Sequence, residues 1–555
     1  MKNIALLFLV FAILLTFEKA KGEEYPIVKI RNWMTIIGRV KTTVDIHKTY
    51  HVFYAIPYAT PPIGELRFKA PLPLQETGTN KVINSSYDGC VCVQLFPSEG
   101  GCEDCLYLNV YKPHFRAPSV LLPVMVWIHG GAYVYGDSKY TSYGPDFLIN
   151  ENVMVVTLNY RLGVFGFLST EDDIAPGNYG IKDQVLALQW IHENIIYFGG
   201  NPDRVTLFGE SAGSSSVSYL AQFPVTKGLF QGVIMESGTN LCPWSIQVQP
   251  LRNAQSLAKL LDINTTSPET MIDGLRKVDY ETVQAAQELL FYKIVLLHGL
   301  DGLPLAPVLE PPSSGALITR GNYDLIKKGK FHKVPYLLGY NALEVNSPVV
   351  TAVIGEIYLS LMRYNFKPEE MVPIGLNIRG SEVMAKVTEM IRTYYFNDEL
   401  IITSEKEMIK FLSETWFVRP ITKSAQFYAQ YAPAYFYVFS YVGRLGSGNS
   451  QEVGHSEELP YIWNIKGKNN ATLEDLKVRH RMVKFWTNFA KFGNPTPFKD
   501  SSLDNVIWPT INTNDNFQYL DIGRTTNVSI NPNWDSLTFW TNLFDDFQNP
   551  PYITY

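Results

Sequence analysis

One serine in this chain lies between two glycines in a setting typical of a nucleophile. Ser211 belongs to the segment Gly209-Glu210-Ser211-Ala212-Gly213, which follows the apolar run 205–208 and precedes a helix-compatible run that ends before Pro224. A sharp strand-to-helix turn crowds the Cβ atoms beside the serine, so the flanking positions need glycine while the hydroxyl stands exposed. A Gly-x-Ser-x-Gly pattern also arises by chance in loops, but the strand before it and the helix after it favour a nucleophile.

A glycine-rich segment upstream could serve that nucleophile. His129-Gly130-Gly131-Ala132-Tyr133 follows the apolar run 124–128. Such a segment lets backbone N–H groups approach a substrate and aim at one point, as acyl transfer requires for the negative oxygen of its intermediate. A simple turn is the alternative. We expect the donors to be the N–H groups of Gly131, Ala132 and Ala212, from an earlier strand loop and from the residue after the serine.

The acid and the base should follow the serine if the chain order is serine, carboxylate, histidine. Glu344 lies just past the apolar run 334–340, although many surface glutamates have similar positions. Only His455 and His480 lie beyond it. We expect His480 on the surface, because it sits between two arginines on an amphipathic helix, whereas His455 follows a strand and a glycine-bearing loop.

These residues together predict acyl transfer through an acyl-enzyme intermediate. His455 would accept the Ser211 proton and later protonate the leaving alcohol, and Glu344 would fix the tautomer of the imidazole. The sequence contains no HExxH motif, phosphate loop or dinucleotide fingerprint, so it implies no metal and no cofactor.

The elements that position these residues indicate a parallel sheet covered on both faces. Apolar strands alternate with glycine-bearing loops and with a helix expected at 183–197, and the strands are expected at 124–128, 153–158, 205–208 and 232–235. Functional sites of such sheets form at the carboxyl ends of the strands, which is where Ser211 falls.

The first part of the chain is rich in β-formers. Residues 27–43 and 50–59 predict strands that make an antiparallel edge leading into the main sheet. His47 and His51 are four apart, but in a strand-favouring region we expect two independent histidines rather than a metal pair.

Composition and termini point to a secreted chain. The 555 residues carry a formal net charge of −6 with no basic stripe, which argues against a nucleic-acid partner. Residues 1–22 have the charged start, apolar stretch and small-residue end of a signal peptide. No later run reaches a membrane-spanning length, so we expect no membrane span.

The cysteines and the glycosylation sequons also agree with secretion. Four cysteines, Cys90, Cys92, Cys102 and Cys105, crowd into sixteen residues, and Cys242 stands apart. Zinc is the alternative, but the spacing and an oxidising compartment favour disulfides. Glycosylation sequons, which also occur by chance, begin at Asn84, Asn264, Asn470 and Asn527.

The motifs resemble those of the type-B carboxylesterase and cholinesterase family of α/β-hydrolases over nearly the whole mature chain. The segments that carry the resemblance are EDCLYLNV from Glu103, HGGAY, NYRLGVFGFLST from Asn159, GNYGIKDQVLALQWIHENI from Gly177, FGGNPDRVTLFGESAG from Phe198 and WTNFAKFGNP from Trp486. The resemblance implies one catalytic domain at 23–555, with a large, mostly parallel central sheet flanked by helices and insertions that form a deep pocket. It also assigns Glu344 and His455 to the family's acid and base positions, in LLGYNALEV and GHSEELPYIW.

Other features are implied by the same resemblance. Trp244 would line the acyl side of the pocket, and the family's first disulfide would join Cys92 to Cys105. Cys90 and Cys102 are then extra to the family pattern, and we expect a second local bridge between them. Cys242 would remain a buried thiol. Ala132 replaces the third glycine of the oxyanion segment, although its N–H stays available.

Departures from the family bear on the substrate. The segment between Cys92 and Cys105 lacks the tryptophan with which cholinesterases stack a quaternary ammonium. The Gly-Glu-Ser elbow and Glu452 differ from the juvenile hormone esterase pattern. The resemblance therefore best suggests an insect-type secreted carboxylesterase acting on a small-molecule ester. The alternatives are a hormone-specific esterase or lipase of the same fold and a non-catalytic adhesion or binding ectodomain, and the presence of Ser211, Glu344 and His455 argues against the last.

Overall fold

The structure is a computed structural model, and it describes most of the chain. The described residues are 25–76, 79–95, 100–114, 120–298, 302–348, 350–351, 357–397, 399–446, 452–512 and 516–555. The predicted signal peptide at 1–22 lies outside them.

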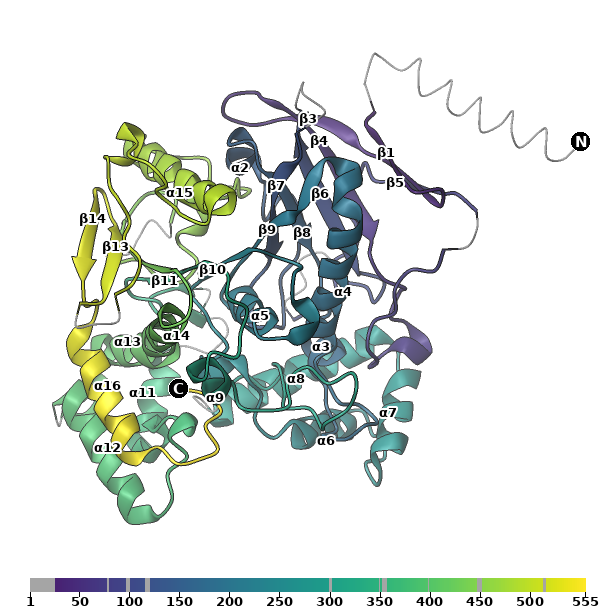
Figure 1. Ribbon diagram of the computed structural model, residues 1–555. Coiled ribbons are helices and arrows are strands. Elements are labelled where there is room, and N and C mark those ends of the chain that lie inside the picture. Colours follow the sequence, from purple (N-terminus) through teal and green to yellow (C-terminus); the bar gives the residue numbers. More distant parts are fainter. Residues whose placement is uncertain are drawn as a thin grey trace, which may run out of the picture.

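An eleven-stranded sheet forms the centre of the molecule (Figure 1). Its order is β14-β13-β12-β11-β10-β9-β7-β8-β6-β4-β3, and the strands from β8 to β13 are parallel, with antiparallel strands at both edges. The strands are β3 (Arg39–Thr42), β4 (Thr49–Pro57), β6 (Tyr107–Pro113), β7 (Leu122–Ile128), β8 (Met154–Leu158), β9 (Gly200–Glu210), β10 (Gly232–Glu236), β11 (Tyr336–Asn341), β12 (Ala434–Phe439), β13 (Gln518–Ile522) and β14 (Thr526–Ile530). The predicted mostly parallel α/β sheet is confirmed.

The predicted edge of the sheet is only half right. β3 and β4 join the main sheet, but β1 (Ile27–Ile30) and β2 (Met34–Ile37) pair with β5 (Lys81–Asn84) in a separate three-stranded sheet. A Cβ on Gly38 would lie 2.4 Å from the carbonyl oxygen of Val52, so the glycine allows the chain to leave β2 and approach β4 closely. The expectation that all of residues 27–43 feed the main sheet was therefore wrong for its first two strands.

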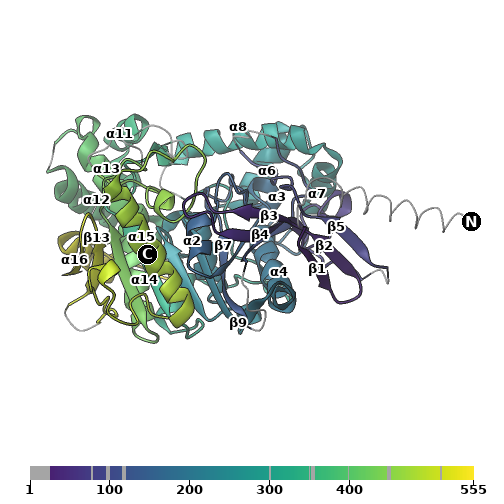
Figure 2. The ribbon, with the colours of Figure 1, turned by 90° about the horizontal axis from the view of Figure 1, so that it is seen from above.

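Helices cover both faces of the sheet (Figure 2). On one face α4 (Tyr179–Asn194), α5 (Ala212–Leu220) and α14 (Arg419–Ala429) pack against the strands, and on the other α2 (Asp146–Asn150) and α15 (Leu473–Phe492) do so. Along β7, Val124 and Val126 belong to the hydrophobic core on the side of α4 and α5, while Met125 and Trp127 belong to the core on the side of α15. Both faces of a parallel strand are thus buried, which explains the uninterrupted apolar runs of the sequence.

Insertions after β10 and β11 add a second group of helices, along the lower side of Figure 1. They are α6 (Pro250–Leu260), α7 (Pro268–Lys277), α8 (Tyr280–His298), α9 (Asn322–Lys327), α11 (Ile357–Phe366), α12 (Ser381–Phe396) and α13 (Glu405–Ser413), to which α16 (Trp534–Phe547) is added near the end of the chain. A π-helical turn, η8 (Glu414–Val418), joins α13 to α14. Turns of this kind often occur at functional sites.

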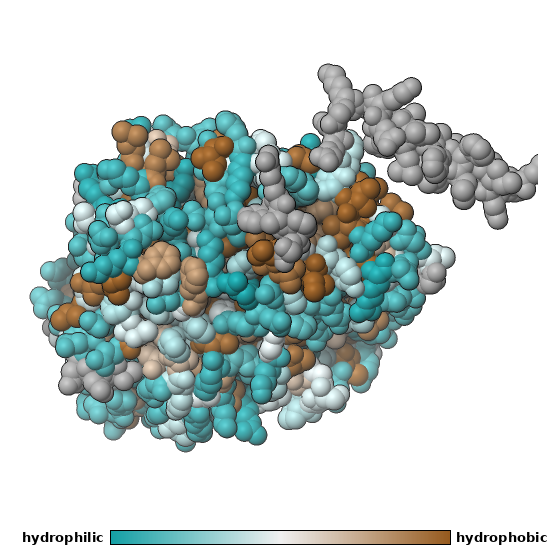
Figure 3. All heavy atoms as spheres, turned by 45° about the horizontal axis from the view of Figure 1, so that its top comes forward, coloured by the Kyte–Doolittle hydropathy of each residue, from teal (hydrophilic) through white to brown (hydrophobic). Residues whose placement is uncertain are grey.

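The cysteines form two disulfides, Cys90–Cys102 and Cys92–Cys105, and Cys242 is a buried free thiol. The asparagines of all four sequons are exposed. No helix among the described residues is long and apolar enough to cross a membrane. Hydrophobic side chains on the face shown in Figure 3 form separate small groups between hydrophilic ones.

Candidate active site

Ser211 occupies the turn between β9 and α5. Its backbone has φ 57° and ψ −122°, a conformation that residues other than glycine rarely adopt. Its N–H donates to the carbonyl oxygen of Glu236 at 2.8 Å. A Cβ on Gly209 would lie 2.7 Å from Gly213 O, and one on Gly213 would lie 2.0 Å from Ile128 O. The two glycines are therefore required because backbone from β7, β9 and α5 meets at this point.

The segment after β7 lies against this turn. A Cβ on Gly130 would lie 2.6 Å from Oε2 of Glu210, and Gly131 and Ala132 have φ values of 106° and 52°. Among the described residues, no protein acceptor is found for the backbone N–H groups of Gly131, Ala132 and Ala212. Three unpaired donors beside a serine are the arrangement that an oxyanion requires, and the N–H of Ala212 also belongs to the positive end of α5.

Glu344 and His455 meet although they are 111 residues apart. Glu344 lies just after β11, is fully buried, and places Oε2 at 2.6 Å from Nδ1 of His455. The main chains are also joined, because the N–H of His455 donates to the carbonyl oxygen of Glu344 at 2.9 Å. The other oxygen of Glu344 accepts the N–H of Asn341 at 2.8 Å. The loops after β11 and β12 therefore hold the imidazole in one orientation.

The second ring nitrogen of His455 faces a different carboxylate. Its Nε2 lies 3.0 Å from Oε1 of Glu210, and the same oxygen accepts a hydrogen bond of 2.6 Å from the hydroxyl of Ser456. Among the described residues the hydroxyl of Ser211 has no hydrogen-bond partner. Burial lowers the pKa of His455, but the charges of Glu210 and Glu344 outweigh it and raise that pKa well above the usual value. The geometry is thus that of a protonated imidazole held between two carboxylates.

Two further acids lie buried beneath this pair. Glu236, at the end of β10, accepts a 2.8 Å hydrogen bond from Nε1 of Trp486 on α15, and burial raises its pKa well above the usual range. Burial and the nearby charges of Glu210 and Glu344 raise the pKa of Glu458 to about 8. Both carboxyl groups therefore keep their protons to a higher pH than an exposed glutamate does.

Our sequence reasoning did not assign roles to Glu210, Glu236, Ser456 or Glu458. Three of them are adjacent to, or three residues from, a predicted catalytic residue, and that proximity was the available signal. Glu236 is 25 residues beyond Ser211, and only the parallel register of β9 and β10 brings it underneath.

A cavity of about 220 Å³ opens above Ser211 and His455. Its polar floor contains Glu210, Ser211, His455 and Ser456, while its walls are mainly apolar and include Trp244, Leu303, Val350, Trp416, Phe417 and Leu459. Nε1 of Trp244 donates to the carbonyl oxygen of Trp416 at 3.0 Å, and the ring of Phe417 lies 4.7 Å from that of His455. The π-helical turn thus supplies part of the wall, and Trp244 lies in the wall as well.

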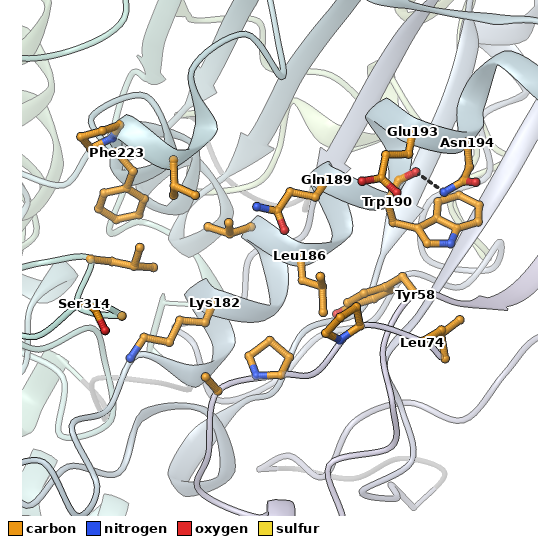
Figure 4. Close-up of a pocket in the computed structure, with 18 of the residues that line it drawn as sticks. Tyr58, Leu74, Lys182, Leu186, Gln189, Trp190, Glu193, Asn194, Phe223 and Ser314 are labelled. Carbon is orange, nitrogen blue, oxygen red and sulfur yellow. Dashed lines mark hydrogen bonds between the residues drawn. The ribbon is translucent and has the colours of Figure 1, made fainter. Parts of the chain in front are cut away.

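A larger hollow of about 690 Å³ lies elsewhere, beside α4 (Figure 4). Leu186, Gln189 and Trp190 of α4 face Tyr58 and Leu74 across it. None of the predicted catalytic residues lines this hollow. The cavity above Ser211 is therefore the candidate active site, because it combines a serine, a histidine and backbone N–H groups for which the described residues offer no acceptor.

Among the described residues, no group of three or more His, Cys, Asp or Glu side chains is arranged to hold a metal ion. His51 lies beside His114, with 3.2 Å between their ring nitrogens, a pairing that the sequence did not predict. His480 is exposed on α15, as predicted.

Known proteins resemble the chain over nearly its full length. A family model described as "Carboxylesterase family" matches residues 24–540. The chain is 30% identical to venom carboxylesterase-6 of Apis mellifera, covering 95% of this chain and 96% of that protein. It is 32% identical to a juvenile hormone esterase of Tribolium castaneum, covering 88% and 86% respectively.

Two solved structures also resemble the chain over nearly its full length. Juvenile hormone esterase from Manduca sexta, with OTFP covalently attached, has a TM-score of 0.83 and 27% identity, covering 94% of this chain and all of that one. PNB esterase has a TM-score of 0.76 and 30% identity, covering 93% and 100%.

Proposed function

Since the chain belongs to the carboxylesterase family, is a carboxylic ester hydrolase and has the α/β-hydrolase fold, we propose that Ser211, Glu344 and His455 carry out its ester hydrolysis. One observation carries this assignment. A strained turn presents Ser211 at the floor of a cavity whose lining also includes His455 and the glycine-rich segment with unpaired N–H groups. Glu344 binds Nδ1 of His455, the ring nitrogen opposite the one that would face Ser211.

The proposed reaction has two acyl-transfer steps. His455 first loses its Nε2 proton to solvent water, and Nε2 then accepts the proton of the Ser211 hydroxyl as the serine oxygen attacks the ester carbonyl. The negative oxygen that forms is bound by the N–H groups of Gly131, Ala132 and Ala212, each worth about 3 kcal/mol. Nε2 returns the proton to the leaving alcohol. Water then attacks the acyl-serine with the same histidine as base, and Glu344 keeps Nδ1 protonated throughout.

The walls of the cavity favour esters with an apolar acyl group. Trp244 and Phe417 are large and buried, and their ring centroids lie 5.7 Å apart. A cavity of about 220 Å³ suits a small or medium acyl chain better than a long one. A general carboxylesterase is therefore our first proposal.

A hormone-specific esterase is the second candidate. The likeness in shape to the Manduca sexta juvenile hormone esterase favours it, and the covalent OTFP in that structure agrees with a covalent route in the family. A longer substrate would have to extend past the apolar wall toward the cavity mouth. Comparison of short-acyl esters with a long branched ester would separate the two proposals.

We also propose that residues 1–22 are removed as a signal peptide and that residues 23–555 form one secreted domain. Two disulfides and four exposed sequon asparagines support this route. Mass spectrometry of protein secreted by insect cells would test it, through a new N-terminus at Glu23 and glycan mass on the sequon peptides.

The central test is hydrolysis of a short-acyl p-nitrophenyl ester by the purified protein. Ser211→Ala should lower kcat by at least about 10³-fold, while Ser256→Ala, in the half-buried part of α6 and outside the cavity lining, should not. A fluorophosphonate should label Ser211 in the parent, which peptide mass spectrometry would locate. A folded parent that neither turns over nor becomes labelled would support the binding-ectodomain alternative instead.

A further inference from the structure

We propose that Ser456 is a positioning residue that controls how readily the catalytic histidine releases its proton, acting through Glu210. The hydroxyl of Ser456 donates to Oε1 of Glu210, the same oxygen that holds Nε2 of His455. The inference rests on the proposed function, because it concerns the base of that reaction.

The backbone at Ser456 is the first observation behind this role. Its φ is 67°, in the left-handed region that glycine adopts freely and other residues avoid. The residue at this position is a serine, although a glycine would adopt the same backbone without strain. Strain of this kind is tolerated where the side chain has a function, and the function visible here is the 2.6 Å hydrogen bond to Glu210.

The second observation is the competition for one oxygen atom. When Nδ1–H donates to Glu344, Nε2 can face a carboxylate oxygen at 3.0 Å only if it too carries a proton. Glu210 therefore holds His455 in the form that cannot act as a base. The Ser456 hydroxyl shares the charge of Oε1, so it weakens the attraction between that oxygen and the imidazolium.

The release of the proton has a definite consequence. Neutral His455 loses its attraction to Glu210, and its Nε2 becomes free to accept from Ser211. Meanwhile Glu210 keeps the Ser456 hydroxyl as a donor, so its buried carboxylate is never left without a hydrogen bond. Ser456 thereby stabilises the state in which the histidine serves the nucleophile.

Other titratable groups surround the pair but do not make this contact. These groups lie on the neighbouring elements and interact electrostatically with Glu210 or His455. They are Glu236 at the end of β10, Glu344 after β11, Glu458 in the loop that follows His455, and the hydroxyls of Tyr135, Tyr143, Tyr160 and Tyr437. Of these acids, Glu344 favours the imidazolium as Glu210 does. The Ser456 hydroxyl donates a hydrogen bond of 2.6 Å to the Glu210 oxygen that faces Nε2.

The test compares pH profiles of kcat/KM for the parent, Ser456→Gly and Ser456→Ala. Glycine accepts the positive φ without strain, so that variant should fold even if the alanine variant does not. Both should raise the apparent pKa of the acidic limb by about 0.5–1 pH unit, because Glu210 then holds the imidazolium more tightly. Activity below that pKa should fall about 3- to 10-fold, while the plateau at high pH stays within about 2-fold.

Two controls separate this role from a structural one. In a Glu210→Gln background the Ser456→Gly change should produce no further shift, because the shared charge is gone. Ser347→Ala removes a 3.1 Å hydrogen bond to the carbonyl oxygen of His455 without touching Glu210, and it should leave the pKa where it was. A Ser456→Gly profile identical to that of the parent, or a shift that persists in Glu210→Gln, would overturn the proposal.

A second readout does not depend on turnover. The proton between Nδ1 of His455 and Glu344 should give a far-downfield ¹H NMR signal that disappears in His455→Gln, and its titration reports the same pKa. If the parent has no esterase activity but Ser456→Gly moves this titration upward, the proposed function fails while the role of Ser456 stands. An unmoved titration would contradict the role of Ser456 whatever the activity.

Discussion

At the scale of single residues, the charges around one imidazole decide the chemistry. His455 is 4% exposed and lies between two carboxylates that have different effects. Glu344 holds Nδ1 on the side away from the serine, which helps the base. Glu210 holds Nε2, the atom that would accept the serine proton in the proposed reaction. In that reaction one carboxylate would orient the base and the other would compete with Ser211 for it.

This difference predicts opposite outcomes for two substitutions of similar size. Glu210→Gln removes a charge that raises the pKa of His455, so that pKa should fall and the acidic limb of kcat/KM should move to lower pH. Glu344→Gln should instead lower kcat by roughly 10³- to 10⁴-fold at every pH, because the tautomer is no longer fixed. Full pH profiles of both variants on one chromogenic ester would check this. An acidic limb that stays in place in Glu210→Gln would show that the contact does not control the base.

A residue of the pocket wall leads to a second prediction. Trp244 is 3% exposed and packs against Phe417, and its indole N–H binds the carbonyl oxygen of Trp416. Trp244→Ala should open the wall and raise kcat/KM for octanoyl esters relative to acetyl esters by about 10-fold or more, the scale set by a few methylene groups in an apolar pocket. Trp244→Phe, which keeps most of the ring, is the matched control. Equal acyl preferences in all three proteins would place the acyl group elsewhere.

At the scale of elements, the site depends on how closely three segments approach one another. The end of β7, the end of β9 and the start of α5 meet around Gly209 and Gly213. No side chain separates the backbones there. The turn that exposes Ser211 is thus held by main-chain contacts, which any added methyl group would disturb.

Gly213→Ala tests this arrangement. The new Cβ would lie 2.0 Å from the carbonyl oxygen of Ile128, so β7 or α5 must shift, and destabilisation of about 3 kcal/mol or more with loss of esterase activity is expected. Gly315→Ala is a suitable control, because its Cβ would meet nothing within 4 Å and its backbone is not in the left-handed region. Thermal unfolding midpoints of the two variants, measured beside the parent, would decide. A Gly213→Ala protein as stable and active as the Gly315→Ala protein would contradict this account.

Elements also show how far sequence reasoning reaches. Strands β7 to β10 were predictable because strands covered on both faces read as uninterrupted apolar runs, and α15 because its apolar stripe has a helical period. The partner of β2 was not predictable, since its paired residues in β5 lie 47 positions further along the chain and four-residue strands do not specify their neighbours. The burial of Glu236 and the oxygen shared by His455 and Ser456 depend on tertiary packing, which local sequence does not encode.

At the scale of the whole molecule, the fold holds protons that an unfolded chain would release. Glu458 has a pKa near 8 against an ordinary value of 4.5, and the pKa of Glu236 is raised well above 4.5 as well. The pKa of His455 is also raised above its ordinary 6.5. All three shifts have the same sign, so folding is coupled to proton binding across the neutral range.

The consequence is a stability that declines as the pH rises. A group whose folded pKa lies above its unfolded pKa contributes stability that is complete below the unfolded value and is lost as the pH passes through the folded value. For Glu458 this window extends from about pH 4.5 to about 8. Each such proton accounts for a slope of at most about 1.4 kcal/mol per pH unit in the free energy of unfolding.

Glu458→Gln isolates one of these protons. Glutamine cannot ionise but keeps an oxygen for the amide of Asn341, so the unfolding midpoint of this variant should fall less steeply between pH 5 and 8 than that of the parent. Some decline should persist, because Glu236 and His455 are unchanged. Glu407→Gln, on the exposed side of α13, should follow the parent curve, which separates burial from the loss of one charge. Midpoints from thermal unfolding at half-unit pH steps measure all three proteins. Parallel curves for the parent and Glu458→Gln would mean that Glu458 is already ionised in the folded protein over this pH range.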